Sequence, residues 1–139
     1  MAFGYSPKLP ITPIAPGEGG HELTKTAKEA IKQNVKMLVL TVPGERMMHP
    51  NFGVGLRQFM FRPMTNTTFN AIATKVKEQF QIYLPFVEFH GVRFFTNHQD
   101  SSIGENGVRI RIIYAIPSIG ESDALDIFES NGGGSTAVF

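Results

Sequence analysis

Two carboxylates in the middle of the chain are the first candidates for acid–base chemistry. Glycoside hydrolysis needs two carboxyl groups beside the scissile bond, one of them protonated so that it acts as the general acid. Glu45 and Glu88 are the candidates within the predicted folded body. Glu45 adjoins Arg46, whose charge favours the ionised carboxylate and makes Glu45 a poor general acid. Glu88 alternates with apolar residues, which predicts a solvated or paired position on a strand.

The other reactive side chains do not predict an enzyme either. The sequence contains no cysteine and no Gly-x-Ser-x-Gly motif, so thiolate chemistry and the serine elbow are both excluded. His90 and His98 are the closest histidines, but a separation of eight residues is not a recurring metal-ligand spacing. Gly53-Val54-Gly55 lacks the third glycine and the Lys-Ser/Thr of a phosphate loop. We therefore expect no catalytic residue, no metal and no cofactor.

The charges are divided unevenly along the chain. All 13 Lys and Arg residues lie at or before Arg111, whereas the residues after it carry four acidic side chains and no basic one. A mildly basic body without a Lys/Arg cluster does not predict nucleic-acid binding. No apolar run approaches the length that crosses a bilayer, and the start lacks a signal segment. We expect a soluble, unprocessed protein without a membrane partner.

Two helices are predicted from apolar residues that recur at helical spacing. The first begins near Thr24, where Thr26 and Glu29 have the spacing of a capping box, and it ends before Pro43-Gly44. The second is capped by Asn66 or Thr67 and stopped by a proline at position 85. A short extended piece at 46–49 and a short helical turn at 56–61 are expected between them.

Two strands are predicted after the second helix. Residues 86–95 alternate in polarity, with a one-residue slip at Gly91 that predicts a β-bulge. A long polar hairpin loop at 96–107 then leads into a return strand at 108–116. Residues 124–128 fit either a short helix or an added strand.

These elements predict an α+β fold with two main helices on a small, mostly antiparallel sheet that has an open edge and flexible arms. We place an extended Pro/Gly-rich arm at 1–23, the folded domain at 24–116 and an acidic, Gly-rich tail at 117–139. The arm has prolines at every third position, as on one edge of a polyproline II helix, and either stays disordered or lies along a neighbouring subunit. The predicted core comprises Ile31, Val35, Leu38, Phe52, Leu56, Ile72, Val76, Phe80, Val87, Phe89, Ile110, Ile112 and Tyr114.

A long ordered motif runs through the first half of the domain. It reads Gln-Asn in the first helix, Leu-Val-Leu-Thr at its end, then Pro-Gly-Glu-Arg, Pro-x-Phe-Gly-x-Gly-Leu and Phe-x-Pro, between positions 33 and 63. This pattern resembles the baseplate protein W family, also called gene 25-like, of contractile phage tails and related injection systems. The resemblance extends over about 24–116. Family members often carry Glu-Pro-Arg where this chain has Leu84-Pro85-Phe86, so the salt bridges of that tripeptide are not carried over.

The resemblance implies a structural subunit, the sheath initiator, present in six copies around the tube of a virion tail baseplate that is assembled in the host cytoplasm. The implied partners are sheath subunits and baseplate wedge proteins, with tube or hub proteins as further candidates. The family-motif residues, implied to be structural, are Gln33, Asn34, Pro43, Gly44, Glu45, Arg46, Pro50, Phe52, Gly53, Gly55, Leu56, Phe61, Pro63 and Pro85. The residues expected on partner-binding strands are Phe86, Glu88, His90, Arg93, Arg109, Arg111 and Ile113.

A small sheet suits this role because its edges are templates for strand addition. We expect 86–95 and 108–116 to supply the template, the first helix to hold the core and dock onto the wedge, and Arg46 to pin its turn by pairing with a carboxylate or carbonyl. The alternatives are the equivalent part of a type VI secretion baseplate, a peptidoglycan hydrolase, and a peptide-binding module whose ligand is the Pro-rich arm.

Overall fold

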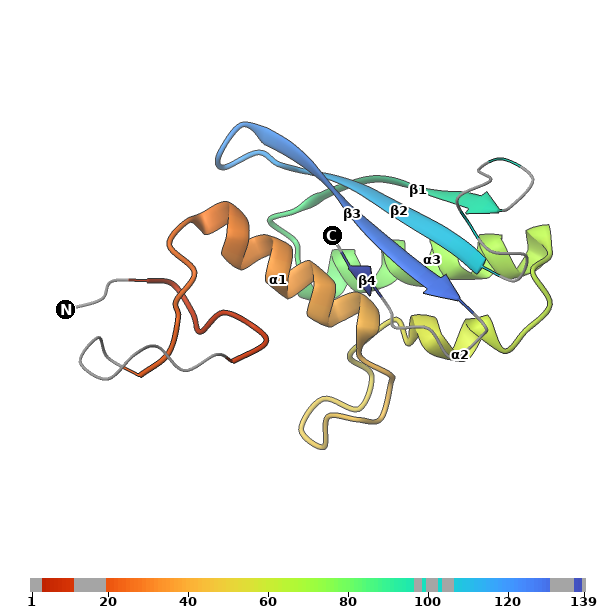
Figure 1. Ribbon diagram of the computed structural model, residues 1–139, viewed down its shortest axis with the longest axis horizontal. Helices are drawn as coiled ribbons and strands as arrows, with labels where there is room; N and C mark the ends of the chain where they lie inside the picture. The colour runs from red at the N-terminus through yellow and green to blue at the C-terminus, as the bar shows by residue number, and fades with distance from the viewer. Residues whose placement is uncertain are drawn as a thin grey trace. The chain divides into compact units, whose positions relative to one another are not determined.

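The computed structural model describes residues 4–11, 20–96, 99, 103, 107–130 and 137–138, and the predicted hairpin loop and Gly-rich tail lie largely outside them. The chain forms two compact units, residues 1–37 and 38–139, and the boundary between them in the sequence falls within the first helix. The elements are α1 (Ala27–Leu40), α2 (Leu56–Met60), α3 (Asn66–Tyr83), β1 (Glu88–Thr96), β2 (Gly107–Ile116), β3 (Glu121–Ser130) and β4 (Ala137–Val138) (Figure 1). No helix in the described ranges is long and apolar enough to cross a membrane.

In the first unit, the N-terminal segment is held by backbone contacts and by one side chain of α1. Residues 5–8 exchange backbone hydrogen bonds of 2.9 Å with residues 22–24. Gln33 then binds the same segment, because its Oε1 accepts from the Leu9 N–H at 3.0 Å and its Nε2 donates to the Pro7 carbonyl at 2.9 Å. The part of the predicted arm that the structure describes is therefore tethered at residues 5–9.

Gln33→Ala should release this segment. Both hydrogen bonds of the side-chain amide are lost, and at an exposed site each contributes on the order of 1 kcal/mol or less. We expect trypsin to cleave after Lys8 about tenfold faster, since proteolysis follows the population of the locally open state. Limited digestion followed by mass spectrometry measures this rate. An unchanged rate would show that the pairing with residues 22–24 alone holds the segment.

The helix starts follow local chemistry. At α1 the N-cap half of the predicted capping box is present, since Thr26 Oγ1 accepts from the Glu29 N–H at 3.2 Å. The return bond differs, because Glu29 Oε2 accepts from the N–H of Lys25, one residue before the cap, at 3.3 Å. At α3 the cap is Thr65, one residue before the predicted positions, since its extended backbone lets Oγ1 accept from the Thr68 N–H at 3.4 Å. The turn predicted at 56–61 forms α2, but the extended piece predicted at 46–49 is not a strand.

The sheet is antiparallel with the order β1-β2-β3-β4, so β2 lies between two full-length neighbours. The register of β1 on β2 shifts between Phe89 and Gly91, which confirms the predicted bulge and leaves His90 without a partner in the register. Strand β3 pairs with β2 from Gly107↔Ser130 to Ile116↔Glu121. The sheet therefore continues past the domain end that the sequence placed at residue 116, and the alternative of an added strand at 124–128 is the one observed.

The core of the second unit lies between α3 and one face of the sheet. The Phe69 ring stacks on the Phe94 ring at 4.5 Å, and the Phe80 ring contacts those of Phe89 at 5.5 Å and Tyr114 at 6.4 Å. The predicted core residues of this unit that are buried are Leu38, Leu56, Ile72, Val76, Phe80, Val87, Ile110, Ile112 and Tyr114, and Val35 of the first unit is buried as well. Ile31, Phe52 and Phe89 are half-buried, and β3 adds Leu125 and Ile127 to the core.

Tyr114 gives the core a specific response to alkaline pH. Its side chain is fully buried and lies opposite Asp123 in the β2–β3 register. Burial raises the pKa of Tyr114, and the negative charge of Asp123 raises it further. The folded state therefore holds this proton more tightly than the unfolded state does, so the contribution to stability is complete below pH 10 and is lost as the pH rises above it.

Tyr114→Phe should remove this response. Phenylalanine fills nearly the same volume, so we expect a change of less than about 1 kcal/mol at pH 7. Between pH 10 and 11 the wild type should lose up to about 1.4 kcal/mol more than the variant, the value of one proton per pH unit. Urea unfolding at both pH values measures the difference. Parallel alkaline curves for the two proteins would contradict the assignment.

Candidate functional site

The motif loop between α1 and α2 is a packed connection. The Val54 N–H donates to the Leu38 carbonyl at 3.0 Å, and the Gly55 N–H donates to the Thr41 carbonyl at 2.9 Å. Both bonds fasten the loop to the last residues of α1 and the residue after it, and they bring the buried Leu56 to the start of α2. The motif therefore fixes the path of the backbone between two helices.

The two charged residues of the Pro-Gly-Glu-Arg turn each make a contact within the motif loop or its turn. Glu45 Oε2 accepts from the Val42 N–H at 3.0 Å, so this carboxylate closes its own turn. The Arg46 guanidinium lies over the Phe52 ring, 4.1 Å from its centroid, and Phe52 in turn meets Tyr83 edge to face at 4.8 Å. The described contact of Arg46 is thus a cation–π contact, in place of the carboxylate or carbonyl expected from the sequence.

Gln79 of α3 holds the opposite side of the motif loop. Its Oε1 accepts from the Gly53 N–H at 2.8 Å, and its Nε2 donates to the Asn51 carbonyl at 3.1 Å. The side chain is 1% exposed, so the bond to Gly53 is shielded from water, while the bond to the exposed Asn51 is partly buried. This is the pattern that Gln33 forms with Pro7 and Leu9, because each amide binds a carbonyl and the N–H two residues later, as a residue of a parallel strand does.

Gly53 lies under this clamp in a conformation that requires glycine. Its φ is +111°, and a Cβ at this position would collide with the backbone carbonyl of Thr41. Several other residues around the motif are exposed: Asn34, Pro63 and Pro85 lie at the surface, as do Met47, Met48 and Phe61. The motif therefore combines a buried scaffold with exposed positions that are free to contact a partner.

The sheet has open backbone edges on both sides. Within the described residues no strand pairs with the outer edge of β1, and β4 covers β3 only at Ile127 and Phe128. Strand β2 is paired along both edges, so the expectation that 108–116 offers a template for strand addition is wrong. Phe86 lies in the turn before β1 rather than on the strand.

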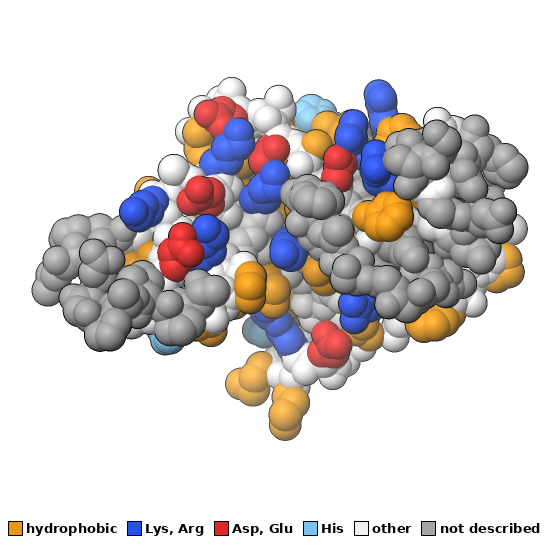
Figure 2. Space-filling view, viewed as in Figure 1, with side chains coloured by type: hydrophobic (Ala, Val, Ile, Leu, Met, Phe, Trp, Pro, Cys, Tyr) orange, Lys and Arg blue, Asp and Glu red, His pale blue; other side chains and the backbone are white. Residues whose placement is uncertain are grey.

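The face of the sheet that points away from the core carries the other expected partner-binding residues. Register pairs Arg93 with Arg111, and Arg111 forms a two-pronged ion pair with Asp126 at 2.6 and 2.7 Å. This hydrogen bond and the charge of Asp126 raise the pKa of Arg111 above its usual value. In the view of Figure 2, basic and acidic side chains are interspersed on the described surface. Arg109 and Ile113 are half-buried on this strand, and Glu88 and His90 are exposed on β1.

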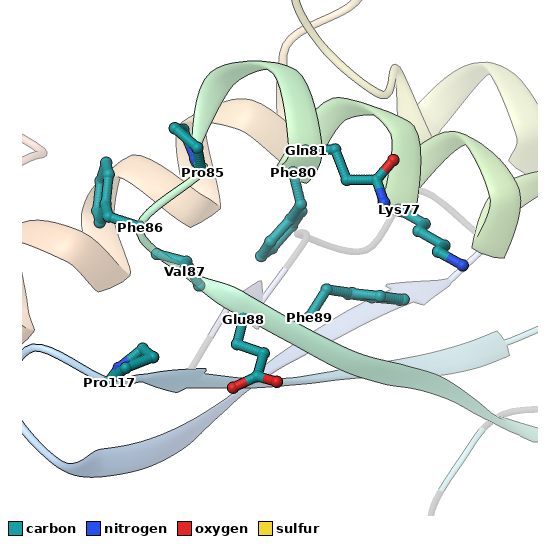
Figure 3. Close-up of a pocket in the computed structure, with 9 residues that line it drawn as sticks. All are labelled: Lys77, Phe80, Gln81, Pro85, Phe86, Val87, Glu88, Phe89 and Pro117. Atoms are coloured by element: carbon teal, nitrogen blue, oxygen red, sulfur yellow. The ribbon is translucent and has the colours of Figure 1, made fainter.

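A groove of about 500 Å³ lies where the start of β1 meets α3. Figure 3 shows Lys77 at one end and Phe86 at the other, with the ring of Phe80 between them. Its lining residues are Lys77, Phe80, Gln81, Pro85, Phe86, Val87, Glu88, Phe89 and Pro117. The lining holds one carboxylate, that of Glu88, so the described groove lacks the carboxylate pair of a glycosidase.

The sequence and the fold agree on a family. The sequence model described as baseplate wedge protein gp25 matches residues 25–119. The chain belongs to this family. A comparison with curated proteins gives no match.

Two solved structures share the gp25-family fold. A chain of the anti-feeding prophage baseplate, determined by cryo-electron microscopy with six-fold symmetry applied, is 26% identical, with a TM-score of 0.63 over 78% of this chain and 81% of its own. A candidate tail lysozyme from Geobacter sulfurreducens is 24% identical, with a TM-score of 0.64 over 82% of this chain and 99% of its own. The second likeness is evidence for the fold alone.

Sequence reasoning missed two features of this gp25-family protein. Gln79 was not singled out, although a polar residue inside the apolar stripe of a helix, three residues after Val76 and four before Tyr83, is a signal for a buried hydrogen-bonding role. The groove was not predicted, because Lys77, Gln81 and Pro117 come together only through the packing of α3 on the sheet.

Proposed function

We propose that this gp25-family protein is a structural baseplate wedge subunit that nucleates a contractile sheath by accepting a sheath strand at the outer edge of β1. The observation that carries the proposal is the open edge, since unpaired backbone N–H and C=O groups are a template for another chain. The bulge at His90 bends this edge, and β2 and β3 anchor it to the core, so a force on the added strand would be passed into the whole sheet.

The proposed role in sheath nucleation also implies how the copies of this protein are arranged in the baseplate. Six copies in a ring around the tube would present six β1 edges to the first row of sheath subunits, and the baseplate of the similar anti-feeding prophage chain was determined with six-fold symmetry. The remaining partners would be wedge proteins, with tube or hub proteins as further contacts, in the tail baseplate of a particle assembled in the host cytoplasm.

A hydrolytic role finds no support in the side chains. Glu45 closes the turn at Val42 and Glu88 is a single carboxylate at the border of the groove. We therefore propose a protein without catalytic residues, whose contribution to the particle is made through its backbone edge and packed surfaces.

Electron microscopy of particles assembled with wild-type protein, without the protein and with His90→Pro tests this function. His90 is exposed and lies at the bulge, outside the register with β2, where a proline is tolerated best and should hinder pairing at the edge. We expect baseplates and tubes without sheath in both altered samples, with a thermal melting curve for His90→Pro close to that of the wild type. Normal sheath in particles that lack the protein would contradict the proposal.

A further inference from the structure

The groove adjoins the start of the edge strand β1. Val87 and Phe89 line the groove, Phe89 belongs to β1, and Val87 immediately precedes the strand. Because β1 is an edge strand, a segment that pairs with the full length of its outer side would run past the start of β1, where the groove lies. Backbone pairing alone would accept almost any extended sequence, whereas a groove beside it can select a side chain.

We infer that this groove is a specificity pocket for the added strand: it takes one large apolar side chain of the partner segment, with a carboxylate two residues away lying at Lys77. The inference rests on the proposed strand addition and names the chemistry of the partner. The occupant must be an extended peptide because the adjoining edge offers hydrogen-bonding groups at strand spacing.

The groove walls favour an apolar side chain. Phe80 is 1% exposed and Val87 is 5% exposed, so the inner wall of the groove belongs to the buried core. Phe86 is 46% exposed and lies at the open end of the groove. A volume of about 500 Å³ falls within the range of sites that enclose sizeable organic ligands and is large enough for an aromatic ring. A ring placed there would bury apolar surface of its own and of Phe86.

The charge at the groove adds a second selection. Lys77 lies at the end of the groove opposite Phe86, and its side chain is exposed (Figure 3). In an extended segment the side chains at positions i and i+2 point to the same face. A partner with an apolar residue in the groove would therefore bring the residue two positions away on the same face toward Lys77, where a carboxylate is favoured.

Blocked, threonine-rich octapeptides titrated into the full chain by NMR test this inference. One pair carries Phe or Ala at the fourth position, and a second pair carries Glu or Gln at the second and sixth positions so that either strand direction is covered. We expect the Phe peptide to bind at least tenfold more tightly than the Ala peptide. We expect the Glu peptide to bind about threefold more tightly than the Gln peptide at low salt.

Three variants make the result specific. Phe86→Ser should reduce the preference for Phe below threefold, whereas Phe61→Ser removes an exposed ring on another surface and should leave it unchanged. Lys77→Glu should reverse the preference for Glu over Gln. Equal binding of the Phe and Ala peptides to the wild type, or a preference that survives Phe86→Ser, would overturn the inference.

The outcome also separates this inference from the proposed function. Side-chain selection by the groove, together with normal sheath in particles that lack the protein, would support the pocket and overturn sheath nucleation. Sheath that depends on the protein, together with no side-chain selection, would overturn the pocket and leave nucleation by the backbone edge in place.

Discussion

Replacement of Gln79 by alanine should lower the free energy of unfolding by about 3 kcal/mol and the Tm by about 10 °C. The substitution removes one buried and one partly buried hydrogen bond and leaves the Gly53 N–H and the Asn51 carbonyl without their partner. Each polar group that is left unpaired in the interior costs roughly 1–3 kcal/mol, and the vacated side-chain volume adds to the loss. Urea unfolding followed by circular dichroism measures the change.

Two further substitutions show which part of Gln79 matters. Gln79→Met keeps nearly the same volume without a hydrogen-bond donor or acceptor. If the hydrogen bonds dominate, this variant should lower the free energy of unfolding by at least half as much as Gln79→Ala does. Gln81→Ala removes an exposed glutamine from the same helix and should change stability by less than about 0.5 kcal/mol. A Met variant as stable as the wild type would assign the effect to packing alone.

Gly53→Ala should have the second large effect, a loss of about 4 kcal/mol that leaves little folded protein in a marginally stable chain. The φ of +111° disfavours any side chain, and the added Cβ would lie 2.8 Å from the Thr41 carbonyl carbon. Relief requires the motif loop to move away from the end of α1, which breaks the bond between the Gly55 N–H and the Thr41 carbonyl. Thermal unfolding and the yield of soluble protein measure the loss.

Gly44→Ala is the matched control. Gly44 has a similar φ of +97°, but an added Cβ would meet nothing within 4 Å. Only the backbone strain remains, so the expected loss is about 1–2 kcal/mol. Equal losses for the two variants would mean that φ alone sets the requirement for glycine at position 53 and that the contact with Thr41 yields easily.

The sequence predicted those parts of the fold whose signals are local. The cap at Thr26, the apolar stripes of α1 and α3 and the slip at Gly91 each depend on residues close together in the chain, and each matches the structure. The local signals at 124–128 fit either a helix or a strand, because this acidic segment becomes a strand only when β2 is available for pairing.

The interaction surface was less predictable for the same physical reason. That 108–116 is a central strand depends on β3, which pairs with it from the far side, and the contact of Arg46 with Phe52 depends on the folding of the motif loop. The family resemblance singles out the motif residues as a group, but it does not give their contacts. Those contacts depend on Gln79 and Thr41, which bind the motif loop only in the folded protein.

The two glutamine clamps have a consequence for how this protein can diverge. A side-chain amide that binds a carbonyl and an N–H of another segment makes no demand on that segment's side chains. Substitutions at Leu9 or Asn51 can therefore accumulate without loosening the anchor, provided that the backbone keeps its path. The side chains of the N-terminal segment can in this way change from one relative to another, while Gln33 holds any sequence that keeps the N–H at position 9.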